Sequence, residues 1–346
     1  MLALGGTEDL LRIVGIGGGT GLPLLMKGLC REGDPAQVCL TALVCVSDNG
    51  GSSGRLREEF QIPAVGDIRN CLLGLSPPGS VLADLLQHRF SGGNGLAGHS
   101  LGNLVLSALY QQTGNLGKAI DRLTEALPVS GAVLPVTEVP VTLCAEGRDG
   151  RIVKGESEIT AARMSIRQLW LEPERPMAAP GVLESLEAAD AIVLGPGSLF
   201  TSVVPPLLVG GVAEAIRRSG AVRIYVCNLM EEPGETDELT AADHVRAVEE
   251  RLGPGALDVC VLNTRAPRAQ LRQRYLAAGA RPVVGDLEAI QARGIQTIGA
   301  ALLGAEGPKA RHDAPGLARL ILELAQARVA RQPAGAGRET PALRGS

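Results

Sequence analysis

The run Ile13-Val14-Gly15-Ile16-Gly17-Gly18-Gly19-Thr20-Gly21-Leu22 decides the fold. A short stretch rich in β-branched residues ends in a cluster of glycines and leads directly into a helical pattern that carries Leu24, Leu25 and Leu29. Glycine allows the backbone to turn sharply and to approach a ligand closely, because it has no Cβ. The helix that follows offers unpaired N–H groups and the positive end of its dipole. The run therefore predicts a strand, a tight turn and a helix whose N-terminus suits an anion such as a phosphate.

The glycine loop matches neither of two common nucleotide-binding signatures. No placement of the dinucleotide pattern G-x-G-x-x-G fits; starting from Gly15, for example, puts Thr20 at the last position. No Gly-Lys-Ser or Gly-Lys-Thr follows, so the loop is not a Walker loop either. Taken alone, a tight turn without a ligand explains the loop as well as a phosphate site does.

Strands and helices alternate along most of the chain. Further strand-like runs occupy residues 38–46, 191–194, 222–227 and 257–262, and helical patterns occupy 81–90, 101–110, 209–218, 241–252 and 317–330. Such alternation implies a parallel sheet that is covered on both faces. Residues 130–172 differ, since they contain alternating segments around the turn Arg148-Asp149-Gly150-Arg151. We expect a Rossmann-like three-layer α/β/α fold with a mostly parallel sheet and an antiparallel excursion around residues 130–172.

Composition limits the classes of function. The formal net charge of −4 and a pI near 5.7 argue against non-specific binding to nucleic acid, which needs a basic face. The seven cysteines form no C-x-x-C pair, which favours free thiols in a reducing compartment. The longest uncharged run, residues 191–213, is broken by prolines and glycines and does not fit a membrane span. We expect a cytoplasmic protein with one domain over residues 10–330 and a disordered tail over 331–346, which is rich in Pro, Gly and Arg.

Polar segments follow four of the predicted parallel strands, after Ile16, Val46, Leu194 and Cys227. The carboxyl ends of parallel strands meet at one edge of the sheet, where ligands of such folds bind. Asp48 lies just beyond the second strand, where a carboxylate can hold a ribose hydroxyl or a metal ion, although a turn or cap residue explains it as well.

Three further segments carry candidate side chains. The N–H groups and hydroxyls of residues 50–55 can form an anion-binding nest with Arg55, whereas a solvated helix face is the better interpretation of Arg57. Asp67 can serve the site or cap a helix and pair with Arg69. His99 lies in a glycine-flanked loop and is a candidate base, although a structural histidine is the commoner case.

No nucleophile with an adjacent base is visible, and no cluster has metal-ligand spacing, so no metal site is assigned. The residues favour a nucleotide or phosphate site over any particular reaction. The candidate catalytic residues are Asp48, Asp67 and His99.

Seven motifs together resemble one family. They are IGGGTGL (16–22), VSDNGGSSGRLR (46–57), GDIRNCLLGLS (66–76), GHSLGNL (98–104), DGRIVKGES (149–157), GPGSLFTS (195–202) and YVCNLMEEPGETD (225–237). The chain resembles the CofD–YvcK family from about residue 13 to 324. That family joins 2-phospho-L-lactate transferases to bacterial gluconeogenesis factors, and the resemblance is closer to the second branch.

The resemblance implies a regulatory protein that binds UDP-sugars, UDP-N-acetylglucosamine in particular, and supports cell shape, wall synthesis and growth on gluconeogenic carbon. The transferase branch implies instead a Mg²⁺-dependent reaction between a guanosine-linked donor and a deazaflavin acceptor. Many family members carry an Asp where this chain has Asn49, which weakens the metal-dependent alternative. An NAD-dependent oxidoreductase is disfavoured by the missing dinucleotide spacing, although NAD could occupy the same cleft.

The motifs and the residue chemistry together give the expected binding site. A nucleotide is the expected ligand, a regulatory protein and a second copy of the chain are the expected partners, and nucleic acid is not one. The binding residues that we expect are Gly17, Gly18, Gly19, Thr20, Gly21, Asp48, Asn49, Gly50, Gly51, Ser52, Ser53, Arg55, Asp67, Asn70, Asn103, Gly195, Gly197, Ser198 and Asn228.

Overall fold

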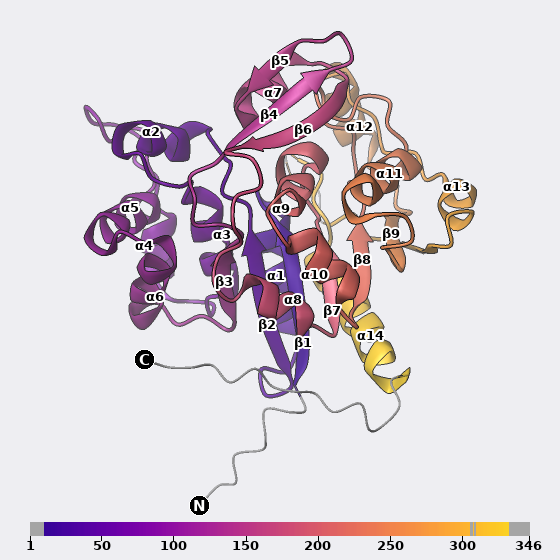
Figure 1. The fold of residues 1–346 in the computed structure, drawn as a ribbon, viewed down its shortest axis with the longest axis horizontal. Coiled ribbons are helices and arrows are strands. Elements are labelled where there is room, and N and C mark those ends of the chain that lie inside the picture. The colour runs from indigo at the N-terminus through magenta and orange to yellow at the C-terminus, as the bar shows by residue number, and fades with distance from the viewer. Residues whose placement is uncertain (1–9, 305–306, 308, 332–346) are drawn as a thin grey trace, which may run out of the picture.

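The computed structural model describes residues 10–304, 307 and 309–331. Its main sheet has seven parallel strands in the order β10-β9-β8-β7-β1-β2-β3 (Figure 1). The predicted mostly parallel sheet is confirmed. The strand bounds are β1 Leu11–Gly17, β2 Val38–Val44, β3 Ala132–Pro135, β7 Ala191–Leu194, β8 Val222–Val226, β9 Val259–Asn263 and β10 Gln296–Ala300.

Helices cover both faces of this sheet, as the prediction requires. On one face α1, α3 and α14 pack together, and on the other α8, α9, α10 and α11 do so (Figure 1). The helix bounds are α1 Gly21–Glu32, α2 Gly51–Phe60, α3 Gly66–Leu75, α4 Val81–Gln87, α5 Leu101–Thr113, α6 Leu116–Ala126, α7 Glu156–Ala162, α8 Val182–Glu187, α9 Val204–Leu207, α10 Val212–Arg218, α11 Ala241–Leu252, α12 Ala269–Ala277, α13 Leu287–Gln291 and α14 Ala314–Arg331, with a π-helix, η2, at Leu199–Val203.

The core forms where β1 meets α1. Ile13 and Ile16 of β1 are fully buried, as are Leu25 and Leu29 of α1. Removing such apolar side chains from water supplies the main driving force for folding. Gly15 allows the closest contact between the two elements, because a Cβ there would lie 2.2 Å from Cε of Met26. The opening run of the sequence thus sets the spacing of the central layer.

The antiparallel excursion is a separate three-stranded sheet in the order β5-β4-β6, with bounds β4 Thr142–Gly147, β5 Ile152–Lys154 and β6 Ile166–Glu172. Its first strand begins at Thr142, because β3 pairs in parallel with β2 and extends the main sheet instead. The helices α2 to α6 lie between β2 and β3, and α3, which packs against both strands, provides the crossover that a parallel connection requires. We call this three-stranded sheet the small sheet.

Several other features bear on the sequence predictions. All seven cysteines are free, and five of them are buried, whereas Cys39 is exposed. Across the described ranges no helix has both the length and the apolar character that a membrane crossing needs. Arg331 is the last residue of α14, and the rest of the predicted tail, 332–346, lies outside the described residues.

Candidate functional site

The strand order reverses direction at β1. From β1 the chain passes through α1 to β2 on one side, while β7 lies on the other side and leads outward to β8. In parallel sheets of this kind, ligands bind in the crevice beyond the carboxyl ends of the two strands at such a switch point. The crevice here lies between the glycine loop 17–21 after β1 and the loop 195–198 after β7.

Backbone contact joins these two loops. The N–H of Gly195 donates to the carbonyl of Ile16 at 2.9 Å. A Cβ on Gly21 would lie 2.1 Å from the carbonyl oxygen of Pro196, so only glycine fits there. The glycines of both loops therefore allow an approach that any side chain would prevent.

A cavity of about 170 Å³ occupies the switch point. Its walls come from residues 18–21, 196–198 and 228–232, with Tyr275, Arg311 and His312 on the remaining side. A second cavity of about 190 Å³ follows the carboxyl ends of β8 and β9 and shares Asn228 and Leu229 with the first. We call the two cavities together the crevice.

The glycine loop is held in place by α3. The N–H of Gly19 donates to Oδ2 of Asp67 at 2.6 Å, and Nδ2 of Asn70 donates to the Gly19 carbonyl at 3.5 Å. Burial raises the pKa of Asp67 to about 6, and the charge of Asp48 also raises it, although the hydrogen bond from Gly19 acts in the opposite direction. Thr20 is the N-cap residue of α1, but its hydroxyl makes no capping hydrogen bond to the helix.

The next loop along the edge, which follows β2, contacts α7, the helix between β5 and β6. Oδ1 of Asp48 accepts from the N–H of Gly50 at 2.8 Å. Both ends of the Asn49 amide are engaged, since Nδ2 donates to Glu158 at 2.6 Å and Oδ1 accepts from the Ser157 N–H at 2.9 Å. An aspartate at this position could not donate to Glu158, so Asn49 docks α7 onto the loop.

Residues 51–60 form the helix α2, although a nest-forming loop was expected at the start of this segment. The interpretation of Arg57 as a solvated side chain was wrong. Arg57 is half-buried and donates to the carbonyls of Ser47, Asp48 and Val141 at 2.6–3.2 Å. It ties the loop after β2 to the start of the small sheet. Arg55 is exposed and donates to the carbonyl of Ala97 at 2.8 Å.

A buried polar network lies behind this loop. Oγ of Ser52 lies 3.0 Å from Nδ1 of His99 and accepts from Nδ2 of Asn103 at 3.1 Å. Arg69 donates to Oδ1 of Asn103 at 2.9 Å and also to Ser100. His99 is only 5% exposed, and burial, with Arg55 nearby, lowers its pKa. These polar residues lock α2, α3 and α5 together and do not line the crevice.

Several carboxylates surround the glycine loop. Burial and the charges of Asp48 and Asp67 raise the pKa of Glu156 to about 9. Burial, followed by the charge of Glu235, raises the pKa of Glu232 to about 7. Within the residues that the structure describes, no group of three or more His, Cys, Asp or Glu is arranged to hold a metal ion.

Two predicted side chains converge on Glu232. Its carboxylate accepts from Oγ of Ser198 at 2.9 Å and from Nδ2 of Asn228 at 3.3 Å. The structure thus brings Gly18–Gly21, Gly197, Ser198 and Asn228 to the cavity wall, with Gly17 and Gly195 directly behind. Asp67 and Asn70 support the wall from α3. Asp48 lies near Asp67, Gly50 contacts Asp48 and Ser157, Gly51 is exposed, and Oγ of Ser53 packs against Gly66.

The family model described as "2-phospho-L-lactate transferase CofD" matches residues 13–303. The chain belongs to the CofD family. It is 42% identical to the "Gluconeogenesis factor" of Bacillus subtilis over 313 residues, which cover 90% of this chain and 98% of that protein. It is also 42% identical to the "Gluconeogenesis factor" of Halalkalibacterium halodurans over 311 residues, covering 90% and 95%. The crystal structure of protein BH3568 from Bacillus halodurans superimposes with a TM-score of 0.87 at 41% identity and covers 90% of this CofD-family chain and 99% of that one.

Sequence reasoning missed three residues that line this CofD-family site, namely Glu232, Arg311 and His312. Glu232 lies inside a quoted motif and could have been found there. Arg311 and His312 carried a weaker signal, a compact charged triplet with Asp313 close to the last helix. Burial lowers the pKa of His312 to about 4, so its imidazole is neutral.

Proposed function

We propose that this CofD-family protein is a nucleotide-sugar-binding regulator whose ligand is a UDP-sugar, UDP-N-acetylglucosamine in particular. The regulated processes are carbon metabolism, cell shape and cell-wall synthesis in a cytoplasmic setting. The observation that carries the proposal is the crevice. Two small neighbouring cavities that share the lining residues Asn228 and Leu229 fit an elongated ligand better than a compact one. The relatives named gluconeogenesis factor support the regulatory class.

The diphosphate of such a ligand suits the first cavity. The N-terminus of α1 supplies N–H groups and a positive dipole end, and Arg311 is the cationic side chain among the residues that line that cavity. A carboxylate binds hydroxyls well, because an ionised oxygen makes short, strong hydrogen bonds. Glu232 with Ser198 and Asn228 therefore suits the hydroxyls of sugar and ribose, and Asp48, which lies near Asp67, is a further candidate for them.

A Mg²⁺-dependent transferase is the alternative, and one observation favours it. Asp48 and Asp67 both raise the pKa of Glu156, and a cation would relieve that repulsion. Carboxylates are ligands that Mg²⁺ prefers, so Asp48 and Asp67 would hold it, and the ion would neutralise phosphate charge. His99, the candidate base from the sequence, lies in the buried network behind the loop and does not line the crevice, so it does not supply a base in this alternative. NAD remains a further nucleotide for the same crevice, and a regulatory partner protein and a homodimer remain proposals.

A thermal-shift and calorimetric titration tests the choice. The ligands are UDP-N-acetylglucosamine, UDP-glucose, GDP, GTP and NAD, each with and without Mg²⁺. We expect UDP-sugars to raise the melting temperature without metal, because a ligand that binds only the folded state stabilises it by about 2.7 kcal/mol at a hundredfold excess over Kd. A shift confined to guanine nucleotides with Mg²⁺ would establish the transferase instead.

Arg311→Ala is expected to weaken UDP-N-acetylglucosamine binding by about 10- to 100-fold, since a hydrogen bond to a charged group contributes about 1.5–3 kcal/mol. Arg31→Ala is the matched control, because Arg31 is exposed near the opposite end of α1. Calorimetry of the two variants measures the difference. Equal affinities in both variants would remove Arg311 from the site.

A further inference from the structure

A larger cleft lies away from the crevice. Its volume is about 1290 Å³, and it lies between β6 of the small sheet on one side and α11 with the segment 235–239 on the other. Its apolar lining includes Leu169, Phe200, Val204 and Leu239. Small-molecule sites are usually roughly 300–1,000 Å³. The size of this cleft therefore favours a polymer as its occupant.

One wall of the cleft is an open strand edge. β4 is the middle strand of the small sheet, so β6 has a neighbour on one side only. Within the described ranges, the backbone of β6 makes its hydrogen bonds to β4 and to no other element. The free edge faces α9 and α11 (Figure 1). An unpaired edge presents a row of N–H and C=O groups that can pair with another extended chain.

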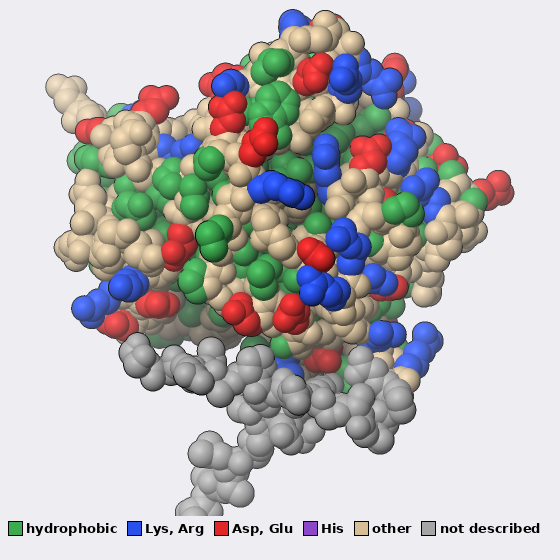
Figure 2. All heavy atoms as spheres, viewed as in Figure 1, with side chains coloured by type: hydrophobic (Ala, Val, Ile, Leu, Met, Phe, Trp, Pro, Cys, Tyr) green, Lys and Arg blue, Asp and Glu red, His purple; other side chains and the backbone are tan. Residues whose placement is uncertain are grey.

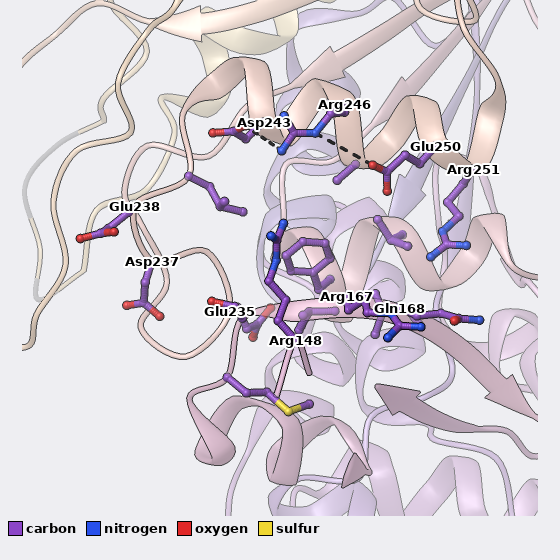
Figure 3. A pocket seen from close by; sticks show the side chains of 18 of the residues that line it. Arg148, Arg167, Gln168, Glu235, Asp237, Glu238, Asp243, Arg246, Glu250 and Arg251 are labelled. Atoms are coloured by element: carbon purple, nitrogen blue, oxygen red, sulfur yellow. Dashed lines mark ion pairs between the residues drawn. The ribbon is translucent and has the colours of Figure 1, made fainter. Parts of the chain in front are cut away.

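Some of the arginines that line the cleft pair with a carboxylate, and others do not. Arg246 pairs with Asp243 at 2.9 Å, and Arg167 pairs with Glu146 at 3.3 Å. In contrast, Arg148, Arg163 and Arg251 have no carboxylate within ion-pair distance in the described part of the chain. Arg148 extends across the middle of the cleft, and Arg251 lies beside Glu250 at the far wall (Figure 3).

The face of the molecule seen in Figure 2 also carries an uneven distribution of positive charge. Lys and Arg side chains gather over the small sheet and the helices beside it, and are sparser over the part formed by α4, α5 and α6 (Figure 2). Asp237 and Glu238 lie on the opposite side of the cleft from Arg251 (Figure 3). An occupant with carboxylates opposite Arg148 and Arg251 would therefore be held in one orientation.

We propose that this cleft binds an extended acidic segment of a partner protein, which adds to the free edge of β6 as a further strand. The backbone of the segment would pair with β6, and its carboxylates would pair with Arg148 and Arg251. Alternate apolar side chains would then rest on Phe200 and Val204. Strand pairing requires a polypeptide, and alternation of side chains across the strand gives specificity. This proposal does not rest on the identity of the ligand in the crevice.

A peptide selection tests the proposal on the full-length protein. Random dodecapeptides displayed on phage are selected on the wild-type protein and counter-selected on the variant Arg148→Glu/Arg251→Glu. We expect surviving peptides to alternate acidic and apolar residues. Their synthetic forms should bind at least about tenfold more weakly to the double variant, because like charges then face each other. Arg31→Glu is the matched control and should bind as the wild type does.

Two further measurements separate strand pairing from simple charge attraction. N-methylation of the alternate peptide nitrogens that face β6 should abolish binding, whereas methylation of the intervening nitrogens should not, and the bound peptide should slow amide hydrogen exchange in residues 166–172. The proposal is overturned if no peptide survives counter-selection, if survivors are basic, or if neither methylated set weakens binding. It is also overturned if sedimentation shows that a second copy of this chain occupies the β6 edge.

Discussion

Gly21→Ala is expected to lower the free energy of unfolding by about 3 kcal/mol and to abolish ligand binding in the crevice. The added Cβ would lie 2.1 Å from the carbonyl oxygen of Pro196 and 2.6 Å from its carbonyl carbon. Both atoms belong to the backbone, so no side-chain rotation relieves the overlap. The loops after β1 and β7 must move apart, and the cavity between them loses its shape. Urea unfolding and calorimetric titration with UDP-N-acetylglucosamine measure the two effects.

Gly92→Ala is the control for this variant. Gly92 is exposed, a Cβ added to it would have no heavy atom within 4 Å, and its backbone is not left-handed. Its replacement should change neither stability nor affinity. If Gly21→Ala unfolded at the same urea concentration as Gly92→Ala, the close approach of the two loops would be disproved.

Glu156→Gln is expected to stabilise the protein at alkaline pH. The pKa of Glu156 is raised from 4.5 to about 9 in the folded state, so the folded protein keeps a proton that the unfolded chain releases. The contribution of Glu156 to the free energy of unfolding is therefore fully present below pH 4.5 and is lost as the pH rises toward 9. Each pH unit in that range costs up to about 1.4 kcal/mol. Glutamine does not titrate, so the variant avoids this loss.

We expect the variant to exceed the wild type by about 2–4 kcal/mol at pH 8, allowing for the partial burial of the side chain, and to match it near pH 4.5. Urea unfolding across this pH range provides the comparison. Glu187→Gln is the control, because Glu187 is exposed at the end of α8. Parallel pH profiles for wild type and Glu156→Gln would show that Glu156 ionises normally.

The parts of the fold that the sequence predicted are local. β1, the glycine loop and α1 follow one another directly, so apolar periodicity and glycine spacing were enough to define them. A helix was expected around Arg57, but the first turn of α2 was expected to form an anion-binding nest, because Gly51, Ser52, Ser53 and Gly54 are poor helix formers. A Cβ at Gly54 would lie 1.9 Å from the carbonyl oxygen of Asn49, so the tight entry to the helix requires glycine.

The parts of the site that escaped prediction depend on topology. Gly19 and Asp67 are 48 residues apart, and their contact follows from the packing of α3 against α1. Arg311 reaches the cavity because the chain returns from β10 to the switch point before α14 begins. Arg57 turned inward because three carbonyls converge on its guanidinium, which no periodicity reveals. The motifs correctly predicted which loops lie at the carboxyl edge of the sheet. They did not predict the side chains that hold those loops in place.

The segment between β8 and α11 lines both the crevice and the larger cleft. Asn228–Glu232 face the crevice and Glu235–Leu239 face the cleft. The turn between them is tied internally, since the Glu232 N–H donates to Oγ1 of Thr236 and the Glu235 N–H donates to the Glu232 carbonyl, both at 2.9 Å. If a nucleotide in the crevice shifts this turn and so changes the affinity of the cleft, thermodynamic reciprocity requires the cleft occupant to change nucleotide affinity by the same factor. A partner at the cleft would then report the nucleotide concentration, and its own abundance would set the concentration at which the nucleotide is sensed.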